Sequence, residues 1–541
     1  MRLSILHRLR KTIRKRDSQF HPQHSGYKWW VLANVMIGTF MAVLDATIVN
    51  VGLPKIMASF GVGIDKIEWV LTAYMLALAV FLPTSGWLAD KFGYKRIYFM
   101  ALLLFTTGSF LCGISNDENM LIFSRVIQGL GAGAIMPIGM AIVMREFPPR
   151  QRGIAMGFWS IAAAASVSFG PLIGGYLVDN YNWQLIFDVN IPVGIIGMFA
   201  TLVIQQEYIS SAVRKFDIIG FLSVSTFLPL VLYALTEANA ATNSQGWSAP
   251  YILVCFGIAA IALAVFITAE LTVEEPLIDL RLLVNHNFGI GNIIVFIFGI
   301  GMFGSTFLLP LYLQNSLGYT AIQSGSVFLP VGIIQGLTAP IVGFISDKTN
   351  PKIPILAGII LLALSFYING FLSFLSEHSY IMMSLYIRGL GMGMIFTPLI
   401  TIGLLEVPHE KMAQASGLFN TIRQLGGSFG VAILATILTS RVTYHSQMYS
   451  EALKANSPAF RSTAAHLNYY IQHNVGSTVI NSAKQAQAVI ISNLNLQAFV
   501  SAVDDDFMIA AIITLLCAIP ILFLHVKKKH FQQAKVEVYE K

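Results

Sequence analysis

The chain has 541 residues, of which 55% are hydrophobic and only 11% are charged. Soluble domains carry about 25% charged residues, so this composition, with a mean hydropathy of +0.68, excludes a water-soluble globular protein. The excess of positive charge, +7 overall, lies at the two ends of the chain. Beside membrane spans such residues set orientation or contact anionic lipid, so we expect the lipid bilayer as a partner and no nucleic acid.

Fourteen apolar segments are long enough to cross a bilayer as helices, which takes about 20 residues each. In chain order the expected spans lie near 29–52, 67–89, 97–115, 120–145, 153–178, 183–205, 216–236, 250–271, 288–311, 323–346, 353–374, 380–404, 413–438 and 507–526. The first span follows a charged leader and has no small-residue cleavage site after it, so we expect it to remain in the protein. The pattern predicts an all-α integral membrane protein.

Two sequence motifs recur in the same order, which indicates a duplicated protein. The turn with Asp90 returns in weaker form at Asp347 (347 − 90 = 257), and Arg125 is matched with Arg388 (388 − 125 = 263). Transporters built from repeats place their site at the interface of the repeats. The predicted organisation is a basic leader (1–28), a six-helix half (29–205), inserted helices 7 and 8 (206–287), a second six-helix half (288–526) and a basic tail (527–541).

Lysine and arginine are unevenly distributed between the short loops on the two sides of the predicted bundle. The leader, the tail and the loops with Lys95 and Lys348 fall on one side, and basic residues in short loops mark the cytoplasmic side. We therefore expect both termini to be cytoplasmic, as an even number of spans requires. On the other side, the loop 440–506 is too long to be structureless, and we expect a small extramembrane helical element there, at Thr463–His473 and Thr478–Ala502.

Asp45 is the sharpest candidate for chemistry. It lies about 24 Å along a helix that starts near Trp29 and crosses a core of roughly 30 Å. A carboxylate costs about 2.5–3.5 kcal/mol at the centre of a spanning helix, and desolvation disfavours its charged form. Such a group can take up and release a proton, so we expect Asp45 in proton coupling; the alternative is a structural polar contact with a neighbouring helix.

The turn between the second and third spans carries a group of polar and glycine residues. Gly93 permits a left-handed backbone in a tight link, and Asp90 can pair with a helix N-terminus of the other half and hold an inner gate shut. The alternative is a basic loop with an incidental aspartate. The residues assigned to this gating motif are Gly86, Asp90, Gly93, Lys95, Arg96 and, in the second half, Asp347.

Arg125 lies a few residues into the fourth span and does not deprotonate in proteins. As a fixed cation it can stabilise the charged form of a nearby carboxylate in one conformation and release it in another, so we expect it to act with the proton-coupling group. The alternatives are snorkelling to the interface and a purely structural ion pair. Small residues at Ser166, Gly170 and Gly174 then form a face for close helix contact on the fifth span.

Several motifs together carry a resemblance to a known family. They are Leu44–Pro54 in the first span, the turn with Asp90, Arg125–Gly133, Gly170–Gly175 and Trp183–Pro192. In this order and spacing they resemble the fourteen-helix drug:proton antiporters of the major facilitator superfamily, EmrB/QacA type, over essentially the whole chain. Ser166 stands where the family usually has glycine, and Gln184 stands where it usually has arginine.

The resemblance implies a major facilitator fold with 14 transmembrane helices in a 6 + 2 + 6 arrangement. It assigns an antiporter motif to Ser166, Gly170, Pro171, Gly174 and Gly175. It also implies a central cavity, to which we assign Asn50, Gln128, Trp159, Phe303, Arg388, Asn420, Arg423 and Gln424. Further aromatic and methionine residues on cavity helices, which repack around varied apolar molecules, are Tyr74, Met75, Met136, Phe307, Phe396 and Phe419.

No pattern in the sequence points to an enzyme. There is no Gly-rich Lys-Ser/Thr phosphate loop, no Cys/His cluster for a metal and no nucleophile elbow, so we expect no ATP, metal or other cofactor. The expected function is proton-coupled export, by alternating access across a bacterial inner membrane, of an amphiphilic compound that is cationic or a neutral aromatic. Loop 440–506 is expected to dock a periplasmic adaptor, or else to form a self-packed cap. The rivals are a transporter of a dedicated metabolite on the same fold and a non-transporting receptor or scaffold.

Overall fold

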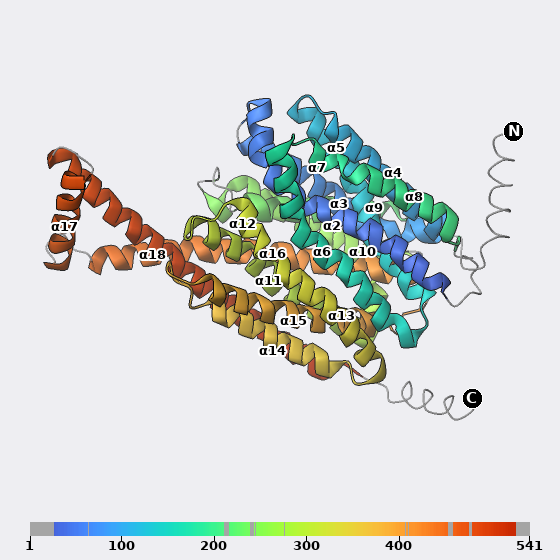
Figure 1. Ribbon diagram of the computed structural model, residues 1–541. Helices are drawn as coiled ribbons and strands as arrows, with labels where there is room; N and C mark the ends of the chain where they lie inside the picture. The colour runs from blue at the N-terminus through green and yellow to red at the C-terminus, as the bar shows by residue number, and fades with distance from the viewer. Residues whose placement is uncertain are drawn as a thin grey trace.

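The computed structural model describes residues 26–525 except for 63, 210–215, 239–242, 244, 275, 406, 409–410, 453–457 and 475–478. Within these residues the chain is helical and has no strand, so the all-α prediction is confirmed. The first and last described helices begin and end at the same end of the bundle, which we call the terminal face. A long hairpin projects from the opposite end, the hairpin face (Figure 1). The basic leader and tail lie almost wholly outside the described residues.

The helices that fall in the two predicted six-helix halves have the following bounds. The first half consists of α2 (Tyr27–Phe60), α3 (Ile64–Phe92), α4 (Tyr94–Gly113), α5 (Glu118–Glu146), α6 (Arg152–Asn180) and a span broken into α7 (Leu185–Asp188) and α8 (Asn190–Ile204). The second half consists of α11 (His286–Asn315), a span broken into α12 (Ala321–Ser326) and α13 (Leu329–Lys348), then α14 (Lys352–Asn369), α15 (His378–Leu404), α16 (Met412–Ala452), α18 (Val479–Leu516) and α19 (Ala518–Phe523).

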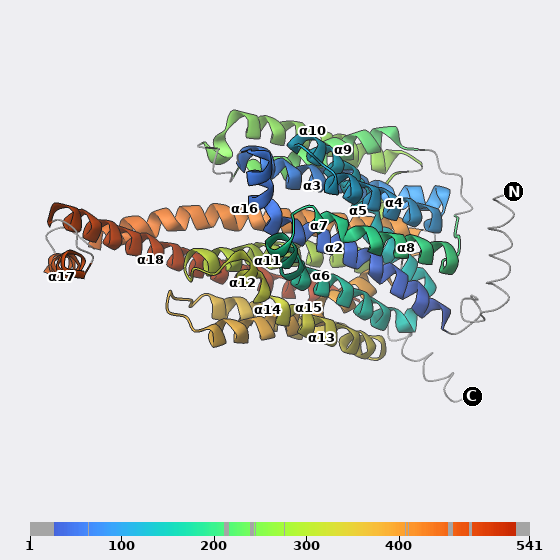
Figure 2. The same cartoon turned by 45° about the horizontal axis from the view of Figure 1, so that its top comes forward.

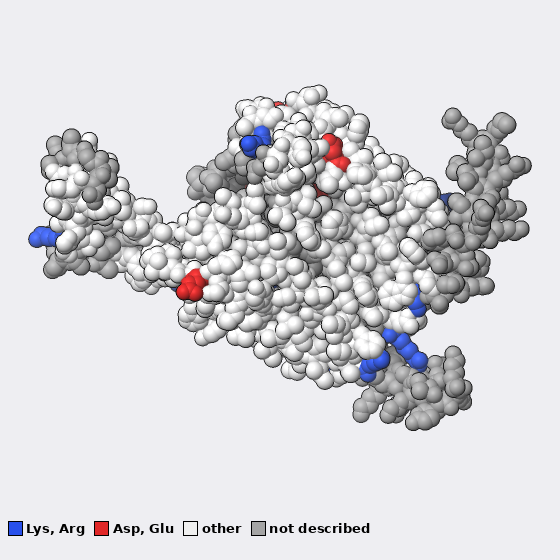
Figure 3. Space-filling view, viewed as in Figure 1, with Lys and Arg blue, Asp and Glu red and all other residues white. Residues whose placement is uncertain are grey.

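The surface of the bundle is suited to lipid. In the described residues, thirteen helical segments are long and apolar enough to span a membrane, and α6, with 29 residues, supplies the fourteenth predicted span. The charged side chains visible in Figure 3 lie toward the two ends of the bundle, and its broad waist shows none. Large apolar side chains at the waist, such as Phe199, Ile261 and Leu337, are more than 60% exposed. A belt of this kind is stable only against hydrocarbon.

The inserted helices α9 (Ile218–Glu237) and α10 (Pro250–Thr272) lie outside the two halves. α9 packs on α3 of the first half and also contacts α16 of the second, while α10 packs mainly on α9 (Figure 2). Trp69 of α3 stacks on Tyr233 of α9 with ring centroids 6.0 Å apart. The pair therefore covers one seam between the halves.

The segment predicted as an extramembrane loop is a helical hairpin continuous with the membrane helices. α16 has 41 residues and α18 has 38, so each is roughly 60 Å long, about twice the thickness of the hydrocarbon core. The predicted helix at Thr463–His473 falls within α17 (Pro458–Asn474), at the tip of the projection (Figure 1). The second predicted helix is not separate, because its residues form the first half of α18. Continuous hydrogen bonding along α18 carries the span straight out of the bundle.

The two halves touch closely near the terminal face. A Cβ atom at Gly157 of α6 would lie 2.5 Å from Pro340 Cα of α13, and Gly153 and Gly343 of the same helix pair also meet backbone to backbone. On the second seam, Gly417 of α16 approaches the carbonyl of Leu82 in α3. These contacts join the halves at one end of the bundle, where glycine allows the helix axes to come close.

We predict that Gly157→Leu destabilises the protein by forcing α6 and α13 apart. Overpacking of this kind costs about 1–3 kcal/mol, so the apparent melting temperature of the detergent-purified protein is expected to fall by several degrees. Gly257→Leu is the matched control, because a Cβ at Gly257 of α10 meets nothing within 4 Å. Equal melting temperatures for the two variants would contradict the close contact of the halves.

Candidate functional site

Asp45 and Arg125 form an ion pair in the interior of the first half. Arg125 Nη1 donates to Asp45 Oδ2 at 2.5 Å, and both side chains are 0% exposed. Asp45 lies in the middle of α2, and Arg125 lies two turns into α5. The structure therefore places the two predicted proton-coupling residues in direct contact, well inside the bundle. Two charges removed from solvent in this way are stable only because each satisfies the other.

Gln128 of α5 and polar groups from three further helices, α3, α4 and α8, complete this network. Gln128 Nε2 of α5 donates to Asp45 Oδ1 at 2.7 Å, and it lies the same distance from Ser109 Oγ of α4. Asn190 Nδ2, at the start of α8, donates to the same Asp45 oxygen at 3.1 Å. Arg125 Nε donates to the carbonyl of Val70 in α3 at 3.1 Å. Asp45 thus accepts three side-chain hydrogen bonds that link α2, α5 and α8, and the contacts of Arg125 and Gln128 extend the network to α3 and α4.

Tyr74 separates this network from the central cavity. Its ring lies against the Arg125 guanidinium, 4.0 Å from the ring centroid, and its hydroxyl donates to the carbonyl of Ala42 at 3.4 Å. Tyr74 also lines the cavity, as do Ala42 and Ala46 of the helix that carries Asp45. The Asp45 carboxylate is therefore one side chain away from the cavity and is not part of its wall.

The cavity lies between the two halves and has a volume of about 270 Å³, close to the lower end of the roughly 300–1,000 Å³ found for ligand pockets. Its wall is mostly aromatic and methionine. Trp159 of α6 stacks on Phe396 of α15 with centroids 6.3 Å apart, and its indole donates to Thr39 Oγ1 at 2.9 Å. The contacts between the halves at Gly157 and Gly417 lie between this cavity and the terminal face, so that end is shut.

Nine of the residues expected at the cavity line it in the structure. The expected residues that line the cavity are Trp159, Phe303, Arg388, Arg423, Gln424, Tyr74, Met75, Met136 and Phe396. Gln128, Asn420, Phe307 and Phe419 are not among its described lining residues: Gln128 belongs to the Asp45 network, and Asn420 accepts a hydrogen bond from Arg423 at 3.2 Å. The side chain of Asn50 lies outside the described residues.

The packing of glycines corrects the proposed match between Arg125 and Arg388. Gly129 and Gly131 of α5 approach the carbonyl of Tyr74 in α3 and the backbone nitrogen of Phe105 in α4. In the second half Gly389 approaches the carbonyl of Val331 in α13, and Gly391 approaches the nitrogen of Leu362 in α14. Equivalent positions of α5 and α15 therefore differ by 389 − 129 = 260 in residue number, and not by 263. Since 388 − 128 = 260, Arg388 is the structural counterpart of Gln128.

The gating motif is folded onto the end of α8 in the same half. Gly93 has φ +101°, which favours glycine, and a Cβ there would collide with the carboxylate of Glu207. Lys95 Nζ donates to the carbonyls of Leu202 and Gln205, at 2.7 and 2.6 Å, where a cation stabilises the helix C-terminus.

Other members of the motif make contacts of their own. Arg96 Nε lies 3.4 Å from Glu207 Oε2. Asp90, which is buried, accepts a hydrogen bond from the Tyr94 hydroxyl at 3.0 Å. Gly86 is buried in α3, and the side chain of Asp347 lies outside the described residues. Glu207, which the sequence did not single out, is thus the anchor of the turn, and the latch between the halves stays a prediction.

The small residues of the predicted antiporter motif make close helix contacts. Gly170 faces Thr47 and Gly174 faces Ile48, so both admit α2, and Gly175 admits Ile322 of α12. Ser166 Oγ donates to the carbonyls of Phe40 and Ala162 at 2.9 and 2.6 Å, which explains how serine is accommodated in place of glycine. The side chain of Pro171 lies outside the described residues.

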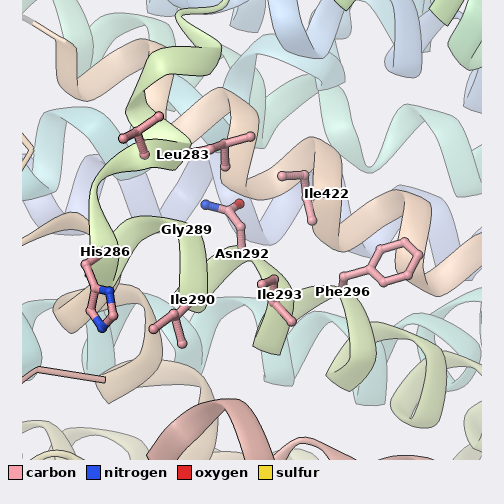
Figure 4. A pocket seen from close by; sticks show the side chains of 9 residues that line it. Leu283, His286, Gly289, Ile290, Asn292, Ile293, Phe296 and Ile422 are labelled. Atoms are coloured by element: carbon pink, nitrogen blue, oxygen red, sulfur yellow. The ribbon is translucent and has the colours of Figure 1, made fainter. Parts of the chain in front are cut away.

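A second groove, of about 540 Å³, lies at the start of α11, and Figure 4 shows the side chains that line it. Its wall is apolar except for His286 and Asn292, and Val284 and Ile293 on its rim are 85% and 53% exposed. His286 is already bonded to the carbonyl of Phe523 at 2.7 Å. This groove is a lipid-facing surface. Across the described part of the chain, no group of three or more His, Cys, Asp or Glu residues could hold a metal ion.

The helical bundle has the fold of a membrane transporter, and comparison with known families agrees. The sequence profile of the Major Facilitator Superfamily matches residues 35–431. The chain belongs to this superfamily of membrane transporters. A solved structure of the human organic anion transporter MFSD10 (TETRAN) superposes with a TM-score of 0.60 over 92% of this chain and 99% of that one; at 12% identity it supports the fold alone.

Similar proteins cover nearly the full length of the chain. The multidrug export protein EmrB of Escherichia coli strain K12 is 31% identical over 479 residues, 88% of this chain and 91% of EmrB. The uncharacterized MFS-type transporter YhcA of Bacillus subtilis strain 168 is 30% identical over 515 residues, 94% and 95% of the two chains. The fatty acid resistance protein FarB of Neisseria gonorrhoeae is 30% identical over 497 residues, 92% and 95%.

We predict that the two members of the buried ion pair are strongly coupled in stability. Arg125→Gln leaves the Asp45 charge buried without its counter-ion, which costs about 3–5 kcal/mol, whereas Asp45→Asn/Arg125→Gln together remove both charges. The double variant is therefore expected to be more stable than Arg125→Gln alone in denaturant unfolding. The control is Arg441→Gln, whose pair with Asp505 is partly exposed and is worth about 0–1 kcal/mol. Additive effects at Asp45 and Arg125 would contradict the coupling.

Proposed function

We propose that this chain is a proton-coupled exporter of amphiphilic drugs or toxic compounds that works by alternating access. The observation that carries the proposal is the Asp45–Arg125 pair, which is sealed from solvent yet is separated from the central cavity only by Tyr74. Similarity to proteins named for multidrug export supports the direction of transport.

The geometry suggests how a proton could be linked to movement of the halves. Protonation makes Asp45 neutral, which removes its attraction for Arg125 and one acceptor of the network. Arg125 then needs other partners, and its ring contact with Tyr74 connects any shift of the guanidinium to the cavity wall. Binding and release of the proton thus favour different positions of α2, α3 and α5. A change of this kind biases two global states through differential contacts.

We place the terminal face in the cytoplasm of a bacterial inner membrane, as the distribution of basic residues in the loops suggests. The closed contacts between α6 and α13 and between α3 and α16 then belong to the state in which the cytoplasmic side is shut. The glycines at these contacts supply two surfaces that can separate when the halves rock.

Two other functions fit parts of the same structure. A transporter of a dedicated metabolite, for export or uptake, would share the fold, the cavity and the proton site, and only the direction and selectivity of transport would differ. A non-transporting receptor or scaffold would make the buried charges purely structural. It predicts no gradient-dependent flux and no effect of Asp45→Asn beyond stability.

We predict that Asp45→Asn abolishes proton-driven efflux of a fluorescent amphiphile from everted vesicles, because the amide cannot take up and release a proton. Glu377→Gln, at an exposed acid outside the bundle interior, is the control and is expected to keep wild-type efflux. The protein level and its melting temperature are compared in both variants, so that loss of fold is distinguished from loss of coupling.

Three outcomes of this measurement discriminate between the functions. Proton-driven efflux that survives Asp45→Asn would rule out Asp45 as the coupling group. Accumulation of the compound against the expected direction, under an imposed gradient in proteoliposomes, would favour uptake. The absence of any gradient-dependent flux in the wild type would favour the receptor or scaffold.

The projecting hairpin is suited to a partner outside the membrane, and we propose a periplasmic adaptor of the membrane-fusion class. The hairpin extends away from the bundle (Figure 2), and its aromatic side chains at Tyr444, Tyr469 and Tyr470 are more than 50% exposed. Exposed aromatic residues are typical of protein interfaces. The alternative is a self-packed cap, in which α17 only covers α18.

We predict that replacing residues 450–502 with a short linker abolishes co-purification with an adaptor and leaves the bundle intact. Most of the residues removed lie in the projecting hairpin, although Val500 and Ala502 at its base belong to the buried core. The cavity is therefore expected to be unchanged and the melting temperature to fall only slightly. The control is a variant with only Tyr469→Ser and Tyr470→Ser, which keeps the hairpin and is expected to weaken the association. Unchanged association after removal of the hairpin would refute docking at this site.

A further inference from the structure

The cavity wall carries buried positive charge that no acidic side chain neutralises. Arg388 of α15 is 2% exposed, and among the described residues its Nε, Nη1 and Nη2 atoms have no hydrogen-bond partner. Arg423 of α16 donates to Asn420 at 3.2 Å, and its Nε atom is without a partner in the same part of the chain. Both arginines line the cavity, and none of its described lining residues is acidic.

Three of the spans around Arg388 contain no acidic residue. The segments His286–Asn315, Lys352–Asn369 and His378–Leu404, which form α11, α14 and α15, contain no aspartate or glutamate. In α16 the first acidic residue is Glu451, in the projecting hairpin far along the helix from Arg423. α18, which packs on α14 and α16, does carry Asp504, Asp505 and Asp506. In the described residues none of these carboxylates bonds to Arg388, so the positive charge at the cavity has no counter-ion there.

Equivalent positions in the two halves differ in whether their buried polar side chains have partners. Gln128, the counterpart of Arg388, bonds to Asp45 and to Ser109. With the offset of 257 that relates α4 to α14 (362 − 105 = 257), Ser109 corresponds to Phe366 (366 − 109 = 257). Arg388 lies over the Phe366 ring, 4.8 Å from its centroid. In the first half Arg125 has the Asp45 carboxylate as its counter-ion. In the second half Arg388 stands at the position of the Gln128 amide, and the Phe366 ring stands at the position of Ser109, the polar partner of Gln128.

A buried guanidinium without hydrogen bonds is unfavourable, because its five donors lose water and gain no acceptor. Contact with an aromatic face compensates only part of that loss. The missing acceptor must be small enough to enter the cavity and must carry negative charge. An oxyanion meets both conditions, since carboxylate and similar groups match the planar fork of arginine.

We infer that the cargo of this cavity carries an acidic group, a carboxylate or another oxyanion, which pairs with Arg388 and is supported by Arg423. The rest of the cargo is an aromatic or otherwise apolar body that packs against Trp159, Phe396 and the methionines of the wall. This differs from the cationic or neutral cargo expected from the sequence. The inference rests on the proposed transport function of the same cavity, for which it names the class of substrate.

The test compares two probes that share one apolar body and differ in charge. Equilibrium binding of 2-naphthoate and of 2-naphthylmethylammonium is measured on the purified full chain in neutral detergent, with quenching of tryptophan fluorescence as the signal. The wild type is expected to bind the anion more tightly than the cation. Arg388→Gln is expected to weaken binding of the anion by roughly 10- to 100-fold, the value of a charge-assisted hydrogen bond, and to leave binding of the cation unchanged or stronger.

Two further variants separate charge from structure. Arg388→Lys keeps the positive charge and is expected to retain the preference for the anion, with a loss smaller than that of Arg388→Gln. Arg441→Gln, outside the cavity on the projecting part of α16, is expected to bind both probes as the wild type does. A melting temperature for each variant identifies any that fails to fold, in which case Arg423→Gln serves as the second test of the same prediction.

The inference is overturned if the cation binds as tightly as the anion, if the preference for the anion survives in both Arg388→Gln and Arg423→Gln, or if the anion shows no binding up to about 1 mM. Because binding in detergent needs no gradient, these results are independent of efflux. Lost efflux with an intact preference for anions would contradict the exporter, and intact efflux without that preference would contradict only the acidic cargo.

Discussion

A charge inside a membrane protein has to find its counter-charge inside the protein, and the two halves of this chain meet that constraint differently. In the first half Arg125 and Asp45 satisfy each other, with 0% exposure of either side chain. Every other feature of the site depends on this pair: Gln128 and Asn190 orient the carboxylate, Val70 holds the guanidinium, and Tyr74 closes the network toward the cavity. In the second half no acidic side chain offers Arg388 the same partner.

Glycine lets the helices that carry these charges pack closely enough for their side chains to meet. Bilayer helices gain little from hydrophobic association, so they pack through small residues that bring backbones together. The glycines of α5 and α15 contact equivalent backbone atoms in the two halves. This shared packing shows which residues of α5 and α15 occupy corresponding positions. At the positions compared, Arg388 stands where the first half has Gln128, and Phe366 stands where it has Ser109. Helices with similar glycine packing thus carry different polar groups in the two halves.

The sequence predicted the spans well, because a helix in hydrocarbon must be apolar over about 20 residues and the bundle offers few exceptions. It was less successful where the environment changes along one helix. The prediction ended the thirteenth span at residue 438, but α16 continues to Ala452. Beyond the bilayer a helix no longer needs apolar residues, so hydropathy cannot mark its end. The match of Arg388 with Arg125 was also wrong. It paired two arginines because they are the same residue type, whereas the glycines that set the packing pair Arg388 with Gln128.

The amino-acid sequence by itself determined the class of this protein, its long apolar helices and the residues that carry charge into the membrane. Those features follow from local composition and spacing, which need no knowledge of neighbouring helices. Only the tertiary structure decided which charges meet. It brought Asp45 and Arg125 together across 80 residues, folded Lys95 onto the end of α8, and left Arg388 facing the cavity without a partner. Whether a buried charge is compensated depends on contacts between distant segments, and such contacts exist only once the helices are packed.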